Sequence, residues 1–364
     1  MKKKSSKSNG GWKRVLLISL CVLCSIILLG LIAVAIVLND LMGSINRVDP
    51  GNESTMSSEE ASKWIEDNRP TEGTKDPNVS VIDPSDITWE TEDPTAPTGE
   101  TTSTHPDENH LIGDEEHLVN ILLIGSDRRP GEGRGRSDAM ILCTVNTQTN
   151  VITMTSILRD LYVQIPGYQS NRVNASYAFG GISLLNQTLE KNFYIHVDAN
   201  VVVDFTSFAY VVDVFGGVEI ELTQAEANHL NSGYGWDLTA GYNWLDGEQA
   251  LAYSRIRALD SDFGRTERQR NVLEALVSRG TALLDVNSAI PLVKDILRLV
   301  TTDLSDAEIL GYVTRLFPVL LNSTIKTQSI PQMDAYQDAY IDEMMVLLPD
   351  LGKTRQFLRD TLLG

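Results

Sequence analysis

The sequence has few cysteines and few histidines, and both shortages narrow the chemistry open to it. Three cysteines occur in 364 residues, so no disulfide framework is expected. Cys21 and Cys24 stand inside an apolar run, and Cys143 stands alone in a strand-like pattern typical of a small buried hydrophobe. The five histidines are scattered, and His105 and His110 fall in a polar linker. A zinc centre or a histidine base therefore has little to be built from.

Positive charge is also scarce. Lysine and arginine number 30 against 49 aspartates and glutamates, which gives a formal net charge of −19 at pH 7. Because nucleic-acid binding requires a broad basic face, the sequence predicts no nucleic-acid partner, and any anion site must be local. The patterns G-x-x-x-x-G-K-[ST], G-x-S-x-G and H-E-x-x-H are absent. P-loop nucleotide binding, serine-elbow hydrolysis and helical zinc proteolysis are therefore not indicated.

One long apolar run stands near the N-terminus. Residues 15–38, VLLISLCVLCSIILLGLIAVAIVL, hold no charge over 24 positions, and about 20 apolar residues suffice for a helix to cross a membrane. The positive charges of the 1–14 tail precede the run, which places the N-terminus in the cytoplasm and the remainder outside, as a single-pass protein of the cell membrane. A cleaved signal peptide, with Ala33-Val34-Ala35 as its A-x-A-like site, is the alternative.

Composition divides the rest of the chain. Residues 39–117 are rich in Thr, Ser, Pro, Asp and Glu, and such a segment buries too little apolar surface to offset its ordering entropy. We expect a flexible, disordered stalk that adds nothing to the core, with a short helix in SEEASKWIEDN capped by Ser57 or Ser58. One folded domain is predicted over 118–350, followed by a loosely attached tail over 351–364.

Apolar periodicity in the folded part predicts an α/β domain. Strands are expected at 119–125, 138–146 and 151–158, the last two joined as a hairpin by the polar TQTN. Helical spacing follows in SYAFGGISLLNQTLEKNF, DFTSFAYVVDVFG, DGEQALAYS and TERQRNVLEALVSRGTALL, with further strands at VEIEL and IKTQSIP. Two more amphipathic helices are expected within 283–317, and another from MMVLLP onward. Helices packed against a mixed sheet account for this order.

Aspartates and arginines gather where the first strands end. Asp127 follows the first strand and Asp138 opens the second, so both carboxylates are predicted at the same end of the sheet. Two oxygen ligands with open positions for phosphate and water suit Mg²⁺, although aspartate beside Gly and Ser is also ordinary turn chemistry. Arg159 and Asp160 reach the same end if the third strand is antiparallel to the second.

The stretch YSRIRALDSDFGRTERQR, residues 253–270, concentrates arginine in an acidic protein. Arg255 and Arg257 share a face only in an extended segment, whereas Arg265, Arg268 and Gln269 share one face of a helix. Guanidinium groups held together repel one another, and a phosphate bound by their planar forks offsets that repulsion. The plain alternative is an exposed helix with ordinary ion pairs to Asp260, Asp262 and Glu267.

The ordered motifs GSDRR, RSDAMIL, SILRD, RVNASYAFGG and ALAYSRIRALDSDFGRTERQR, behind one apolar helix, resemble those of the LytR-CpsA-Psr family. The resemblance covers residues 118–275. It implies an α/β/α sandwich around a central mixed β-sheet, with an apolar tunnel for a prenyl chain and arginines around a pyrophosphate at its mouth. It also implies transfer of a glycopolymer, such as wall teichoic acid or capsular polysaccharide, from a polyprenyl-pyrophosphate carrier to peptidoglycan in Gram-positive bacteria, with Mg²⁺ bridging the phosphates.

Carried over position by position, the resemblance makes Asp127 and Asp138 the metal-associated carboxylates. It implies pyrophosphate contacts from a set of arginines and one amide, which comprises Arg136, Arg159, Arg255, Arg257, Arg265 and Gln269, with Arg172 and Arg268 as further phosphate ligands. The chain departs from the family pattern at Leu158, where Pro is usual, at Leu161, where Thr is common, and at Arg172, which replaces Lys. The proton acceptor is left open between Asp160 and Asp262.

Two other functions fit the same residues. Water in place of the glycan acceptor would make the protein a polyprenyl pyrophosphate hydrolase. A regulator that binds the lipid-linked precursor without turnover would need the arginines but not both Asp127 and Asp138. The presence of both carboxylates favours chemistry over binding alone.

Overall fold

The computed structural model describes residues 43, 45–69, 75–89, 111–127, 134–282, 295–320 and 322–363. Residues 1–45 and 46–364 form separate units, and the second contains the folded domain. The predicted membrane span at 15–38 and the basic tail before it lie outside the described residues. Within the described residues, no helix combines the length and the apolar character that crossing a membrane requires.

A seven-stranded mixed sheet forms the centre, in the order β1-β11-β8-β3-β4-β5-β12. Its strands are β1 (Asn46–Arg47), β3 (Leu118–Ser126), β4 (Ser137–Asn146), β5 (Val151–Ile157), β8 (Ala199–Asp204), β11 (Thr301–Thr302) and β12 (Thr324–Ile330). β3, β4 and β5 pair antiparallel, while β8 runs parallel to β3 and β12 parallel to β5. The α/β prediction with a central mixed sheet, including the hairpin at TQTN, is confirmed.

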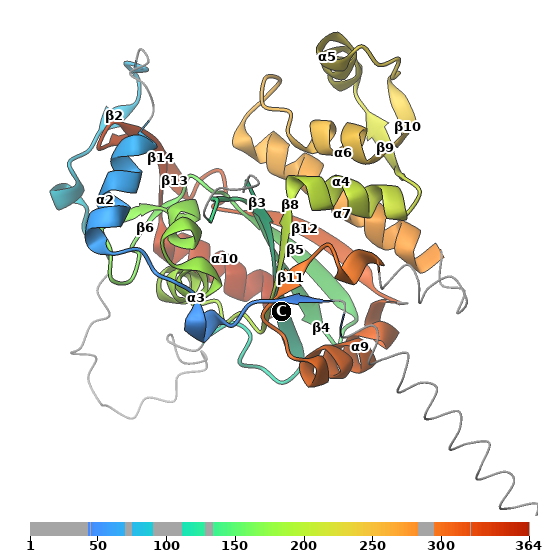
Figure 1. Cartoon of the computed structure of the whole chain (residues 1–364). Coiled ribbons are helices and arrows are strands. Elements are labelled where there is room, and N and C mark those ends of the chain that lie inside the picture. Colours follow the sequence, from blue (N-terminus) through green and yellow to red (C-terminus); the bar gives the residue numbers. More distant parts are fainter. Residues whose placement is uncertain are drawn as a thin grey trace, which may run out of the picture. The chain divides into compact units, whose positions relative to one another are not determined.

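Helices cover both faces of this sheet. Side chains alternate along each strand, so apolar residues on both faces are available to pack against them. Leu122 and Ile124 of β3 belong to a buried core shared with α3 (Val173–Phe193) and α10 (Leu351–Leu362). Leu123 faces the opposite way, towards α4 (Phe205–Val214) and α7 (Asp262–Ala282). Figure 1 shows α3 and α10 on one side of the sheet and α4 and α7 on the other. This arrangement puts an apolar cavity on the α7 side.

A second, smaller hydrophobic core includes α4. It is formed by α4, β9 (Val218–Leu222), α5 (Gln224–Tyr234), β10 (Gly241–Leu245), α6 (Gly247–Ser254) and α7. The predicted strand VEIEL is β9, and it pairs with β10 in a sheet of its own. Capping boxes begin α5 at Thr223 and α6 at Asp246, where a side chain satisfies an otherwise unpaired backbone N–H. α6 ends at Ser254, which leaves Arg255 and Arg257 in non-helical backbone, although Arg255, with φ −106° and ψ 1°, is not in the extended conformation that would place both on one face.

The described part of the segment expected as a stalk is packed against the domain, so that expectation is wrong for residues 46–69 and 75–89. It contains η1 (Pro50–Asn52), α2 (Ser58–Asp67), β2 (Ser80–Val81) and η2 (Pro84–Asp86). Ala61 is buried, Trp64 packs edge-on against Phe179 at 5.4 Å, and β2 pairs with β13 (Tyr336–Ile341). The segment is polar on average, so its composition did not indicate these few apolar side chains. They pack against the surface of α3. The helix capped by Ser57 is confirmed.

The C-terminal tail is also part of the fold, so the boundary predicted at residue 350 is wrong. MMVLLP forms strand β14 (Met344–Pro349), which pairs with β13, and not a helix. Pro349 disfavours helical backbone at the residue before it, which is consistent with the strand. α10 follows at once, and its Leu358 is completely buried against α3. Of the two helices expected within 283–317, α9 (Asp306–Leu320) is present, and residues 283–294 lie outside the described residues.

These contacts predict where the chain can be shortened. A chain beginning at residue 46 should unfold at the same temperature as the full chain. A chain beginning at residue 111 should lose about 3–6 kcal/mol, because the buried or partly buried Ala61, Trp64 and Trp89 leave the core. Thermal unfolding followed by circular dichroism measures both. Equal midpoints for the two shortened chains would show that residues 46–89 add nothing to the fold.

Candidate active site

The site begins at the open end of the β3–β4 pair. Asp127 directly follows β3, and its carboxylate accepts hydrogen bonds from the backbone N–H of Arg136 at 2.5 Å and from the Arg136 Nη2 at 3.0 Å. Asp138 is the second residue of β4. Because β5 is antiparallel to β4, its C-terminal end carries Arg159 to the same place. The predicted meeting of Asp127, Asp138 and Arg159 at one sheet end is confirmed.

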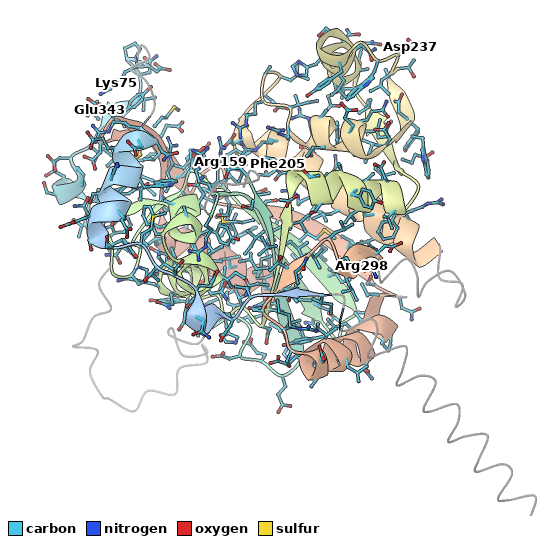
Figure 2. The ribbon with its side chains drawn as sticks, in the orientation of Figure 1. Lys75, Arg159, Phe205, Asp237, Arg298 and Glu343 are labelled. Carbon is cyan, nitrogen blue, oxygen red and sulfur yellow. The ribbon has the colours of Figure 1, made fainter. Side chains whose placement is uncertain are left out.

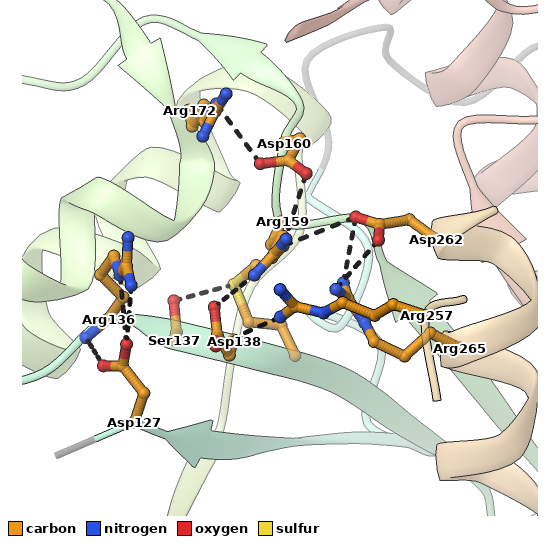
Figure 3. A network of polar contacts seen from close by, with 11 residues as sticks. Asp127, Arg136, Ser137, Asp138, Arg159, Asp160, Arg172, Arg257, Asp262 and Arg265 are labelled. Carbon is orange, nitrogen blue, oxygen red and sulfur yellow. Dashed lines mark hydrogen bonds and ion pairs between the residues drawn. The ribbon is translucent and has the colours of Figure 1, made fainter. Parts of the chain in front are cut away.

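Arg159 lies at the centre of an ion-pair network (Figure 3). Its Nη1 donates to Asp138 Oδ1 at 2.8 Å, and its Nε lies 3.4 Å from Asp160 Oδ2 and 3.5 Å from Asp262 Oδ2. Asp262 opens α7. Three carboxylates from three separate elements therefore hold one guanidinium, whose side chain is 16% exposed.

Three more arginines complete the network. Arg265, one turn into α7, donates from its Nη2 to Asp262 Oδ2 at 3.1 Å and forms an ion pair with Oδ1 at 2.9 Å, and its side chain is buried. Arg257 reaches Asp138 at 3.7 Å, yet its side chain is 53% exposed, the most open of the set. Arg172 lies 3.3 Å from Asp160 and donates to the carbonyl of Met345 in β14. Five arginines thus meet four aspartates, which leaves an excess of one positive charge.

Burial and charge set the protonation of the carboxylates. Burial raises the pKa of Asp160 above its usual value, and a hydrogen bond to Asp262 raises it further. The charges of Arg172 and Arg159 lower this pKa but do not cancel the effect of burial. Burial also acts on Asp262, but Arg265, the same hydrogen bond and Arg159 outweigh it and lower the pKa. Burial likewise disfavours the charged form of Arg159, but Asp160, Asp138 and Asp262 more than compensate and raise its pKa. Asp160 is therefore the stronger base of the two neighbouring carboxylates.

An apolar cavity of about 230 Å³ opens beside this network. Leu123, Ile141, Val201 and Phe208 are among its lining residues. Arg255 and Gln269 also line it, with the Arg255 guanidinium 4.5 Å from the ring centre of Phe205. Among the described residues, the Gln269 Oε1 is buried without a hydrogen-bond partner, and such an atom costs free energy until a donor reaches it. The cavity thus joins an apolar interior to polar groups on two sides.

Two arginines of the 253–270 stretch, Arg268 and Arg270, lie outside both the network and the cavity lining. Arg268, predicted as a phosphate ligand, is buried, and its Nε donates to Glu226 at 2.7 Å while its other nitrogens bind Asp260 and the Ile256 carbonyl. We assign it a structural role that joins α7 to α5. Arg270, which follows Gln269, is buried as well and donates to the hydroxyls of Ser156 and Ser329.

The connection between β3 and β4 has a support at Arg134 that no sequence pattern predicted. Glu53 is almost fully buried; its Oε2 accepts from the Ser183 backbone N–H at 3.2 Å, and its Oε1 lies 3.5 Å from Arg134. Gly181 allows this approach, because a Cβ there would meet the Glu53 carboxylate at 2.1–2.4 Å. Its φ of +68° also breaks α3 into two helical runs. A carboxylate from the expected stalk therefore holds the loop two residues before Arg136, and only the glycine pair in AFGG hinted at it.

Residues 87–357 match the family model described as the LytR_cpsA_psr family. The chain belongs to the LytR-CpsA-Psr family. The match covers most of the chain, including segments on both sides of the 118–275 stretch that carries the motifs. The resemblance inferred from those motifs is confirmed.

Curated relatives carry two kinds of name within this family. The polyisoprenyl-teichoic acid–peptidoglycan teichoic acid transferase TagU of Oceanobacillus iheyensis is 38% identical over 183 residues, which cover 48% of this chain and 55% of that protein. The regulatory protein MsrR of Staphylococcus aureus strain COL is 32% identical over 225 residues, covering 60% of this chain and 66% of that protein. The chain thus spans little more than half the length of the TagU relative.

Solved structures of the family share the fold. A structure titled TagT bound to LI-WTA superposes with a TM-score of 0.57 at 29% identity and covers 68% of this chain and 92% of its own. A LytR-CPS2A-psr family protein, YwtF (TagT), with bound octaprenyl pyrophosphate lipid superposes with a TM-score of 0.53 at 28% identity, again over 68% and 92%.

The raised pKa of Asp160 predicts how stability depends on pH. A raised pKa in the folded state means that this carboxyl stabilises the fold below its unfolded pKa of about 3.9, and that this contribution is lost as pH rises through the folded value. Asp160→Asn keeps a neutral side chain at every pH. The unfolding midpoint of the variant, relative to the wild type, should therefore increase between pH 4 and pH 7. A constant or falling difference over this range would show that the pKa is not raised.

Proposed function

We propose that this protein transfers a glycopolymer from a polyprenyl-pyrophosphate carrier to peptidoglycan, outside a cell membrane in which residues 15–38 anchor it. The observation that carries the proposal is the juxtaposition of the arginine network with the apolar cavity lined by Arg255 and Gln269. A polyprenyl pyrophosphate has the same two parts, an apolar chain and a charged head. Transferase names among the relatives and the lipid in a related structure support the assignment.

The arginines divide into roles by their exposure and partners. Arg257 and Arg255 are exposed enough to meet an entering pyrophosphate, and Arg159 and Arg265 lie behind Arg257 against Asp138 and Asp262. Gln269 lies at the cavity wall, where its unpartnered oxygen can accept a hydrogen bond from the acceptor hydroxyl or from water. Arg136 completes the phosphate-binding set beside Asp127, and Arg172 acts through Asp160.

The reaction that this site supports is phosphoryl transfer. A hydroxyl of the acceptor glycan attacks the phosphorus linked to the polymer, a new P–O bond forms, and the bond to the bridging oxygen breaks to release polyprenyl phosphate. Asp160, whose pKa is raised by burial, takes the hydroxyl proton. The arginines stabilise the charge that develops on the phosphate oxygens, and positioning with charge stabilisation supplies most of the rate in this chemistry.

Mg²⁺ belongs to this proposal through Asp127 and Asp138. Their carboxylates come from neighbouring strand ends, and within the described part of the chain no group of three or more His, Cys, Asp or Glu forms a fuller metal site. Two carboxylates suit Mg²⁺, which keeps several waters and binds substrate phosphates. When bound, the ion would neutralise phosphate charge beside the arginines.

Two other functions, a hydrolase and a regulator, would give different results in the same experiment. A hydrolase would use water in place of the acceptor hydroxyl in the same site. A regulator would bind the lipid-linked precursor without turnover, and the name of the MsrR relative is the observation that favours it.

Mass spectrometry of the purified full-length chain separates these functions. With a polyprenyl-pyrophosphate-linked glycopolymer, Mg²⁺ and peptidoglycan fragments, we expect polyprenyl phosphate and a glycopolymer joined to the fragments. Lipid release without an acceptor would indicate the hydrolase, and an unchanged donor would indicate the regulator.

Arg257→Ala should weaken inorganic pyrophosphate binding about tenfold to a hundredfold, as the loss of a hydrogen bond to a charged group does. Arg298→Ala, an exposed arginine 3.9 Å from Asp295, is the control and should change nothing.

Asp138→Asn tests the metal assignment, with pyrophosphate binding by calorimetry as the measurement. Asp138 pairs with Arg159 and Arg257, so removing its charge leaves Arg257 without this partner and weakens the hold on Arg159, which Asp160 and Asp262 still contact. Without Mg²⁺, the variant should bind pyrophosphate at least as tightly as the wild type. Adding Mg²⁺ should tighten binding in the wild type but not in the variant, because a hard cation needs the carboxylate charge. An equal response to Mg²⁺ in both proteins would remove Asp138 from the metal site.

A further inference from the structure

Residues 205–254, named here the acidic lobe, carry charge of one sign. The stretch contains no lysine or arginine and seven acidic residues, namely Asp213, Glu219, Glu221, Glu226, Asp237, Asp246 and Glu248. It runs from α4 to the end of α6, and Arg255 is the next residue. Figure 2 shows Phe205 at the end of the lobe near Arg159 and Asp237 at its far end. The chain therefore places a negatively charged lobe directly beside its arginine site.

Exposed aromatic side chains concentrate in the same lobe. Tyr210, Tyr234, Tyr242 and Trp244 are between 51% and 70% exposed, and no other aromatic residue is exposed where the structure describes side-chain burial. Clustered exposed aromatics mark recognition surfaces more often than scattered single residues do. The lobe thus combines carboxylates with aromatic rings that its own core does not use.

The antiparallel pair of strands β9 and β10, which α5 connects, arranges these groups in pairs. Tyr242 is directly opposite Glu221, and Trp244 is opposite Glu219. Val218, Ile220 and Leu222 of β9 point the other way into the lobe core, so the four paired side chains share the open face. Trp244 is held in place, because its Nε1 donates to the Gly216 carbonyl at 2.7 Å and the Arg279 guanidinium lies 5.1 Å from its ring centre. The face is therefore a fixed platform of alternating rings and carboxylates.

We propose that this open face of β9 and β10 binds the acceptor glycan, an uncharged polysaccharide chain, which deepens the function proposed above and rests on it. The apolar faces of sugar rings pack on flat aromatic rings, and the carboxylates of Glu219 and Glu221 accept hydrogen bonds from sugar hydroxyls. Arg279 packs on the Trp244 ring, but the acidic residues of the lobe are in excess, and this negative charge opposes an anionic polymer and an anionic lipid surface. The surface thus favours an acceptor over the charged donor.

The position of β9 and β10 also supports a glycan-binding role for their open face. β10 leads through Asp246 into α6, and α6 ends at Ser254 beside Arg255. An eight-residue helix spans about 12 Å, so the platform and the arginines are joined by one short rigid element. α6 packs against the apolar face of β9 and leaves the open face on the outer side of the lobe, where one part of a long glycan can lie while another part presents a hydroxyl at the site.

Co-sedimentation with peptidoglycan sacculi stripped of anionic polymers tests the proposal on the full-length chain. Tyr242→Ala and the double variant Glu219→Gln with Glu221→Gln should each reduce the bound fraction at least fivefold. Titration with chitohexaose, a neutral oligosaccharide, should show the same order, with little dependence on salt. Val81→Ala is the control, because Val81 is a strand residue of another sheet with 71% exposure against 70% for Tyr242.

Unchanged binding by both variants would overturn the proposal. So would binding of the wild type to phosphatidylglycerol vesicles that Tyr242→Ala abolishes, since the face would then contact lipid. Inorganic pyrophosphate binding is measured in parallel and should be the same in all variants. A wild type that fails to bind pyrophosphate would contradict the proposed function and leave the glycan result to be judged separately.

Discussion

The arrangement of the site depends on the enclosure of one guanidinium. Arg159 is held by Asp138 from β4, by its neighbour Asp160 and by Asp262 from α7. A buried charge is costly unless partners surround it, and removing one partner leaves the others uncompensated. The strand end, the segment after β5 and the start of α7 must therefore come together as a set. Arg265 and Arg172 extend the set by pairing with Asp262 and Asp160.

This requirement explains why both ends of the described chain belong to the domain. β14 accepts a hydrogen bond from Arg172 at the Met345 carbonyl, and the Leu347 N–H donates to the Asp160 carbonyl. At the other end, Glu53 holds Arg134 and caps the second half of α3. Segments that looked like a stalk and a tail thus support the residues that carry the charges.

The sequence was sufficient to predict features that depend on neighbouring segments of the chain. It was insufficient to predict features that depend on residues distant in the sequence. Strand succession placed Asp127, Asp138 and Arg159 at one sheet end, because antiparallel neighbours bring alternate ends together. Helical spacing could not separate Arg265 from Arg268, which turn to different partners. Arg268 binds Glu226, 42 residues away in the sequence, and no local pattern announces that pairing. The burial of Ala61 was hidden for the same reason, since α3 supplies the surface that covers it.

The balance of charges decides how such a site can exist before an anion arrives. Five arginines alone would repel one another, and the four aspartates hold them in place without a ligand. An entering pyrophosphate therefore binds by competing with carboxylates, so its affinity is a difference between two sets of ion pairs. Because burial raises the pKa of Asp160, while that of Asp262 is lowered, Asp160 gives up its negative charge more readily than Asp262 and then weakens its hold on Arg159 and Arg172. The carboxylate best suited to accept a proton is thus also the one whose protonation releases arginines to the phosphate.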